Sequence, residues 1–139
     1  MSRARSISKV LSANDTGETG GHQAGILVPK DPTILSFFPS LPREVKNPRH
    51  LLYFRDEVGE QWEFAFIYYN NRYFGGTRDE FRLTRMTPYL KQAGLVAGDE
   101  LILEHEADQG FRIRYVRARK ASLTGGRLRL GGTWKIVKT

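Results

Sequence analysis

Two glycine-containing segments of this chain carry side chains that can read the edges of DNA bases. The first runs from residue 12 to 25 (SANDTGETGGHQAG) and the second from 69 to 85 (YNNRYFGGTRDEFRLTR). In the major groove an arginine can fork onto guanine, asparagine or glutamine can pair with adenine, and a carboxylate can accept from the cytosine amine. Glycine lets a backbone approach a groove closely. We call these segments the first and second arms, and their composition predicts a clamp on duplex DNA.

The polar and basic side chains of both arms are the expected DNA contacts. The alternative interpretation of the first arm is a solvated loop closed by Asx turns. The second arm can also be a charged surface loop with internal arginine–carboxylate pairs. The residues that we expect to contact DNA are Asn14, Asp15, Thr16, His22 and Gln23 in the first arm, and Asn70, Arg72, Thr77, Arg78, Glu80, Arg82 and Arg85 in the second.

The charge of the chain supports a polyanionic partner. Its 139 residues include 22 Lys and Arg against 15 Asp and Glu, which gives a net charge of +7. Such a bias favours nucleic acid, although anionic surfaces and plain solubility are alternatives. From Gln109 onward every charged residue is basic. Charges on alternate residues of a strand share one face, so we expect a basic stripe in which Arg117 and Arg119 contact phosphates.

The elements that must position the arms are mostly short strands. Alternating apolar residues and turn signals predict strands at 6–11, 26–28, 50–58, 61–69, 100–106, 111–119, 127–130 and 134–137. Two short helices are expected at 31–38, with Asp31 as N-cap, and at 87–94, closed by Gly94. This pattern indicates a single mainly β domain (α+β) over residues 1–139, a sandwich or barrel with small helices at its ends.

Several classes of protein are disfavoured by composition. The chain has no cysteine, which excludes disulfides, thiolate metal sites and thiol catalysis. Its three histidines (His22, His50 and His105) lack metal-ligand spacing. We therefore expect no metal and no cofactor. The first residues lack the apolar core of a signal peptide, and no stretch has the length of a membrane span, so we expect a cytoplasmic protein that does not enter a membrane.

An enzymatic alternative is a small magnesium-dependent nuclease. Asp31, Glu44 and Lys46 match the spaced D…ExK pattern of such enzymes, in which two acids hold Mg²⁺ and the lysine polarises the attacking water. The pattern requires adjacent core strands, whereas Asp31 reads as a helix cap and Glu44 lies between two prolines. We therefore interpret the chain as non-catalytic.

A third class is a single-strand or RNA binder of the OB type. Tyr68, Tyr69, Tyr73 and Phe74 can act as stacking platforms for bases, beside the basic carboxyl-terminal strands. Aromatic residues at the end of a strand are, however, more often core or rim packing.

The two arms resemble a known family. At LSANDTGETGGHQAGILVP and IYYNNRYFGGTRDEFRLTR the sequence is similar to the N-terminal effector-binding domain of the EcoRII-type (Type IIE) restriction endonucleases. Around Gly98-Asp99-Glu100 it also resembles the wider family of plant B3-like DNA-binding domains. The resemblance implies a DNA-binding pseudobarrel whose arms enter the major groove. It also implies duplex DNA carrying CCWGG, bound as an allosteric activator of a separate catalytic domain.

The resemblance carries over to particular residues. It implies base contacts from Asp15, His22 and Gln23 in the first arm and from Arg78, Glu80 and Arg82 in the second, with Arg72 on a phosphate or base. The chain departs from the family at Gly76, where the relatives have a basic residue, and at Leu27, where they have an aromatic one. At these two positions a contact of the family is either missing or supplied from elsewhere in the chain. As an isolated domain the chain is expected to be a monomer.

Overall fold

Eight strands form one continuous sheet in the computed structural model, which describes residues 4–20, 25–106, 110–118 and 134–137. The order in the sheet is β2-β5-β4-β3-β7-β6-β1-β8. Every neighbouring pair is antiparallel except β3 with β7. The strands are β1 (Ser6–Val10), β2 (Ile26–Val28), β3 (Arg49–Arg55), β4 (Gln61–Tyr69), β5 (Glu80–Thr84), β6 (Glu100–Glu106), β7 (Gly110–Val116) and β8 (Trp134–Ile136). The prediction of a mainly β fold is confirmed.

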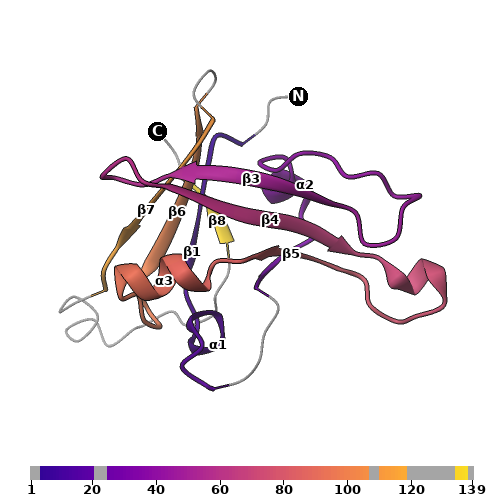
Figure 1. The fold of residues 1–139 in the computed structure, drawn as a ribbon, viewed down its shortest axis with the longest axis horizontal. Coiled ribbons are helices and arrows are strands. Elements are labelled where there is room, and N and C mark those ends of the chain that lie inside the picture. The colour runs from indigo at the N-terminus through magenta and orange to yellow at the C-terminus, as the bar shows by residue number, and fades with distance from the viewer. Residues whose placement is uncertain (1–3, 21–24, 107–109, 119–133, 138–139) are drawn as a thin grey trace.

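The sheet curls into a barrel that is closed by side chains as well as by strand pairing. Its terminal strands are β2 and β8, and the indole Nε1 of Trp134 on β8 donates to the carbonyl of Leu27 on β2 at 3.0 Å. The parallel β3–β7 contact is short, with two pairs of aligned residues, Phe54 with Phe111 and Arg55 with Arg112. Figure 1 shows β3 and β4 crossing over β6 and β7 at a steep angle. The architecture is therefore a pseudobarrel.

Within the described ranges, four short helices lie in the connections: α1 (Ala13–Thr16), α2 (Pro32–Leu35), η1 (Asn71–Phe74) and α3 (Thr87–Ala93). As the sequence predicts, the Asp31 carboxylate caps α2 by accepting from Thr33 N at 2.8 Å. Gly94 ends α3 in the left-handed conformation, with φ of 66°. Figure 1 places α1 at the lower end of β1 and η1 beyond the end of β4, so that the two arms occupy separate corners of the molecule.

One apolar core holds these elements in place. Phe37 and Phe38, just after α2, are buried, and Phe38 stacks on Phe66 of β4 with ring centroids 4.3 Å apart. Tyr89 of α3 is also buried and packs edge-on against Trp62 of β4 at 5.4 Å. Burying large aromatic side chains supplies most of the stability of a small domain, so this core fixes the bases of both arms.

The structure corrects several expectations about the elements. Helix α2 ends at Leu35 and strand β7 at Val116, before the expected ends at 38 and 119. Residues 80–84 of the second arm form strand β5, which pairs with both β2 and β4. The first arm contains a helical turn, α1, where Asx turns were the alternative expectation. Strand β3 ends at Arg55 because the Asp56 carboxylate accepts from the backbone N–H of Val58 and Glu60 and closes a longer turn. The expected strand at 127–130 lies outside the described residues.

Candidate nucleic-acid interface

The second arm presents a cluster of one carboxylate between two arginines. Arg78 donates to Oε2 of Glu80 at 2.9 Å, and Arg82 donates to the same oxygen at 2.8 Å. Glu80 and Arg78 are partly exposed, by 28% and 39% of their side chains, whereas Arg82 is more enclosed at 19%. The guanidinium of Arg78 lies over the ring of Tyr69, 3.8 Å from its centroid. We refer to these residues as the Arg78–Glu80–Arg82 cluster.

The electrostatics of this cluster keep Glu80 charged. Burial acts to raise its pKa, but the hydrogen bonds and charges of Arg82 and Arg78 outweigh burial and lower the pKa below its usual value. Among the described residues, both arginines bond to Oε2, and no hydrogen bond to Oε1 is formed. A carboxylate has two acceptor oxygens, so Oε1 can accept a hydrogen bond from a ligand without breaking the cluster.

Arg82 also joins the second arm to the first. Its Nη1 donates to the carbonyl of Gly25 at 2.8 Å, at the point where the first arm re-enters the sheet. Gly25 has φ of 92°, and a Cβ added there would lie 2.8 Å from the Cα of Thr84 and 2.9 Å from the carbonyl carbon of Leu83. Only glycine allows this close approach to β5. The two arms are therefore held in a fixed relation at their bases.

A second polar cluster, centred on Asp79, lies beside the first. Its carboxylate accepts from the Tyr68 hydroxyl at 2.7 Å and from Nη1 of Arg72 at 3.2 Å, and it pairs with Nζ of Lys30 at 2.7 Å. The hydrogen bonds from Lys30, Tyr68 and Arg72 lower the pKa of Asp79 to about 2. Burial and the hydrogen bond to Asp79 raise the pKa of Tyr68 to about 12. Both groups thus keep one protonation state over the neutral range.

The first arm is anchored by buried and partly buried polar contacts. Ser12 caps α1 and forms a capping box with Asp15, whose carboxylate accepts from the Ser12 N–H at 2.9 Å. Lys9 is ion-paired with the same carboxylate, and the side chains of Lys9 and Asp15 are only 6% and 8% exposed. Farther along, Glu18 accepts from Ala97 N at 2.8 Å. These contacts fix the start of the arm on β1 and on the segment before β6.

The structure gives structural roles to two of the expected contacts. Asp15 is engaged by Lys9 and by the cap of α1, so its carboxylate is not presented to a ligand. Asn70 is 1% exposed and ties the 43–47 segment to the arm by accepting from Asn47 N at 2.7 Å and donating to Val45 O at 2.9 Å. Both side chains are satisfied inside the protein, and their assignment as base-reading residues stays a prediction.

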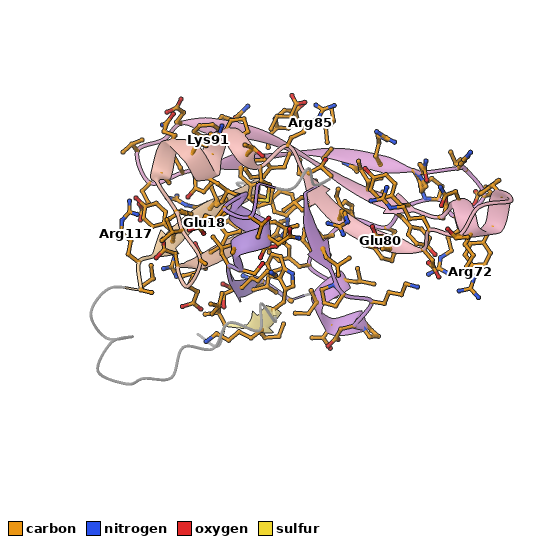
Figure 2. The ribbon with its side chains drawn as sticks, turned by 90° about the horizontal axis from the view of Figure 1, so that it is seen from below. Glu18, Arg72, Glu80, Arg85, Lys91 and Arg117 are labelled. Atoms are coloured by element: carbon orange, nitrogen blue, oxygen red, sulfur yellow. The ribbon has the colours of Figure 1, made fainter. Side chains whose placement is uncertain are left out.

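Two expected arginines lie away from the cluster. Arg117 donates to the carbonyls of Ala93 and Gly94, at 2.6 and 3.2 Å, and therefore caps the carboxyl end of α3. Arg85 pairs with Glu63 at 2.5 Å. Figure 2 shows Arg117 at the far end of the molecule from Arg72, and Arg85 at the upper edge, away from Glu80 and Arg72. Both arginines contact the scaffold in this structure, and their assignment as DNA contacts stays a prediction.

The remaining expected contacts are distributed over the arms. Asn14 is exposed on α1, Thr77 is exposed in the second arm, and Thr16 donates to the Glu18 carboxylate at 2.6 Å. His22 and Gln23, with Arg119, lie outside the described residues.

The residues of the nuclease pattern do not assemble into a metal site. Asp31 caps α2, and Glu44 and Lys46 are exposed in the connection between α2 and β3 instead of lying on adjacent strands. Within the described ranges, no group of three or more His, Asp or Glu side chains could hold a metal ion. In the same part of the chain, no helix is long and apolar enough to cross a membrane.

The aromatic residues of the second arm serve different purposes. Tyr68 is 5% exposed and stacks on Phe81 at 4.2 Å, which makes it part of the packing. Tyr69 supports Arg78, whereas Tyr73 and Phe74 on η1 are exposed by 65% and 44%. These four aromatic residues do not form the continuous exposed platform on which an OB-type binder stacks successive bases.

Sequence reasoning did not single out Lys30 and Asp79 as a pair. In the β2–β5 register, Val28 aligns with Phe81, and continuing that antiparallel register places Lys30 opposite Asp79. Because the polar composition of the arm predicts a loop at 80–84, it predicts no strand register there. The alternation of polar and apolar residues in EFRLT is the signal that would have revealed the strand.

The fold has a clear relative among solved structures. The protein in the structure described as an Arabidopsis FUS3–DNA complex superposes with a TM-score of 0.62 at 19% sequence identity, covering 80% of this chain and 95% of that chain. At this identity the likeness concerns the fold. Together with the curled sheet and its two arms, it places the chain in the class of B3-like pseudobarrel domains.

The sequence then identifies the family. The family profile described as "Restriction endonuclease EcoRII, N-terminal" matches residues 2–92. The Type II restriction enzyme EcoRII of Escherichia coli is 46% identical over 81 residues, which make up 55% of this chain and 20% of that enzyme. The chain belongs to the EcoRII N-terminal domain family. The region of the chain that matches this relative spans about a fifth of the relative's length.

Proposed function

We propose that this chain is a sequence-specific duplex-DNA-binding domain that reads a CCWGG-like site in the major groove with its two arms. It is not itself catalytic. It acts as the effector-binding module of a restriction endonuclease, in which site binding activates a separate catalytic domain. Family membership and the B3-like fold support this function, and the arms supply its chemistry.

The Arg78–Glu80–Arg82 cluster is the observation that carries the proposal. Reading a C·G pair in the major groove requires a guanidinium fork for guanine beside a carboxylate for the cytosine amine. Arg78 keeps unused donors, and Glu80 keeps Oε1 as an acceptor while Arg82 holds its Oε2. Tyr69 supports the Arg78 guanidinium from one side. The cluster is thus preorganised, which reduces the ordering cost of binding.

The first arm complements this cluster. Asn14 is exposed on α1, and His22 and Gln23 follow in the same arm, so we assign to this arm the other half-site. Because the arms differ in sequence, one monomer reads the two halves of a nearly palindromic site with different side chains. The proposal includes a single domain over residues 1–139 that needs no cofactor and works in the cytoplasm.

Selection from a library of random duplexes tests the proposal. We expect enrichment of one short sequence related to CCWGG, and competition in the order specific duplex, random duplex, single strand, RNA. The proposal would be contradicted if no sequence were enriched or if the chain preferred single strands to duplexes. Cleavage of DNA by the purified chain with Mg²⁺ would instead favour the nuclease alternative of Asp31, Glu44 and Lys46.

A pair of matched variants locates the reading site. Arg78→Ala and Arg85→Ala each remove one positive charge that is paired with a single carboxylate. We expect Arg78→Ala to cost about 1 to 3 kcal/mol on the specific duplex and little on random DNA. Arg85→Ala should lower the affinity for the specific duplex and for random DNA by the same small amount. Equal effects of the two substitutions on specificity would refute the assignment.

A further inference from the structure

Lys30 and Arg72 form a pair of cations on the flank of the second arm. They come from separate segments, Lys30 from the connection after β2 and Arg72 from η1, and both bind Oδ2 of Asp79, at 2.7 and 3.2 Å. Their side chains are 53% and 61% exposed, whereas that of Asp79 is 9% exposed. The carboxylate therefore lies behind the two cations, and its single charge leaves the pair with a net positive charge.

Asp79 is itself fixed from the interior. The hydroxyl of Tyr68 donates to its Oδ1 at 2.7 Å, and the buried Tyr68 ring is stacked on Phe81 at 4.2 Å. A second restraint acts on the backbone, where Arg72 N donates to Arg78 O at 2.9 Å. Asp79 consequently sets the positions of both cations. A lysine ammonium has three donors and an arginine guanidinium five, so each keeps donors for an external anion.

We propose that Lys30 and Arg72 form a phosphate clamp for the DNA backbone, with Asp79 as its positioning residue. This inference rests on the proposed function. The major groove admits a two-stranded β-ribbon, and the sugar–phosphate backbones border it. When the end of the sheet formed by β4, η1 and β5 enters the groove, cations on its flank meet a phosphate. Asp79 and Glu80 are successive residues, so their side chains point to different sides of the chain, and the clamp does not compete with the Arg78–Glu80–Arg82 cluster for bases.

Methylphosphonate scanning tests the clamp. Each phosphate of the selected duplex is replaced in turn by a neutral methylphosphonate, and affinity is measured for the wild type and for the double variant Lys30→Met and Arg72→Met. We expect the wild type to lose about tenfold to a hundredfold at one or two adjacent phosphates, as for charge-assisted hydrogen bonds. In the double variant the loss at those phosphates should disappear while losses elsewhere remain.

The salt dependence supplies a second readout with a matched control. Removing one cation that neutralises a phosphate should reduce the log–log slope of affinity against salt by about 0.9. Lys91→Met removes a lysine on α3, which lies at the edge away from Arg72 (Figure 2), and should leave the slope unchanged.

Asp79→Asn separates positioning from simple electrostatics. The substitution makes the arm more positive, so electrostatics alone predicts tighter binding. Loss of positioning predicts weaker binding, and also a smaller loss of affinity when the clamp phosphate is replaced by a methylphosphonate. Near-ultraviolet circular dichroism checks that the variant keeps its native packing. Tighter binding by Asp79→Asn overturns the role of Asp79.

The outcomes distinguish the clamp from the proposed function. If the wild type binds its selected duplex but no phosphate effect depends on Lys30 or Arg72, the clamp is wrong and the proposed function stands. If the wild type binds no duplex, both are wrong.

Discussion

The close approach of Gly25 to β5 gives a test of how the first arm is attached. Substituting alanine there adds a Cβ at 2.8 Å from Thr84 Cα and 2.9 Å from the carbonyl carbon of Leu83. These neighbours are backbone atoms, which cannot rotate away. The residue also has φ of 92°, a conformation that L-residues adopt at a cost of about 1 to 2 kcal/mol.

Gly59 provides the matched control, because its φ is 88° and an added Cβ would have no atom within 4 Å. Gly59→Ala should therefore show the conformational cost alone, about 1 to 2 kcal/mol. Gly25→Ala should show that cost and a further 1 to 3 kcal/mol, roughly, for forcing atoms into a packed site. We expect the free energy of unfolding to be lower in Gly25→Ala than in Gly59→Ala by that difference.

Urea unfolding followed by tryptophan fluorescence measures the two variants. DNA affinity is measured in parallel, because displacement of the first arm from β5 would break the hydrogen bond between Arg82 and Gly25 O. A displaced arm should weaken specific binding in Gly25→Ala and not in Gly59→Ala. The reasoning is refuted if the two variants unfold at the same urea concentration and bind DNA like the wild type.

Three further predictions concern individual side chains. Asn70→Ala removes the hydrogen bonds of a buried side chain to Asn47 N and Val45 O, so the free energy of unfolding should fall by about 1 to 3 kcal/mol; a urea midpoint within error of the wild type would contradict this. The pKa of Asp79 is lowered to about 2 from an ordinary 3.8, so its stabilisation is present above pH 4 and lost as the pH falls towards 2; the stability difference between wild type and Asp79→Asn should shrink over that interval, and a constant difference would count against the ion pairs. A methyl at cytosine C5 projects beside the amine that Glu80 is proposed to bind, so C5-methylated sites should bind more weakly in competition titrations, and equal affinity would argue against close reading of that cytosine.

Much of the scaffold could be predicted from local sequence signals. The Asp31 cap followed by Pro32, and Gly94 after α3, are signals that act over a few residues, and the structure has both helix ends there. The strands at β1, β2, β4 and β6 match their expected ranges closely because alternating burial is a property of the strand itself.

Strand β5 was not predicted, because the charged composition of the second arm outweighed the alternation of polar and apolar residues in EFRLT. Its sequence EFRLT carries three polar side chains, because Glu80 and Arg82 belong to the surface cluster. Its composition is therefore that of a charged loop, and only the neighbours β2 and β4 show that the backbone groups are paired. The partner of a strand is set by contacts distant in sequence, which periodicity cannot reveal.

The sequence by itself determined which residue types the arms carry, but the tertiary structure decided what each of them can do. Asp15 and Glu80 are both acids within polar arms, yet Asp15 is enclosed by Lys9 and a helix cap while Glu80 keeps an exposed oxygen between two arginines. Arg117 likewise caps α3 across a gap of 24 residues. A charged group that its partners enclose is not presented to a ligand, whereas one that keeps an exposed atom is, and only the fold decides between the two.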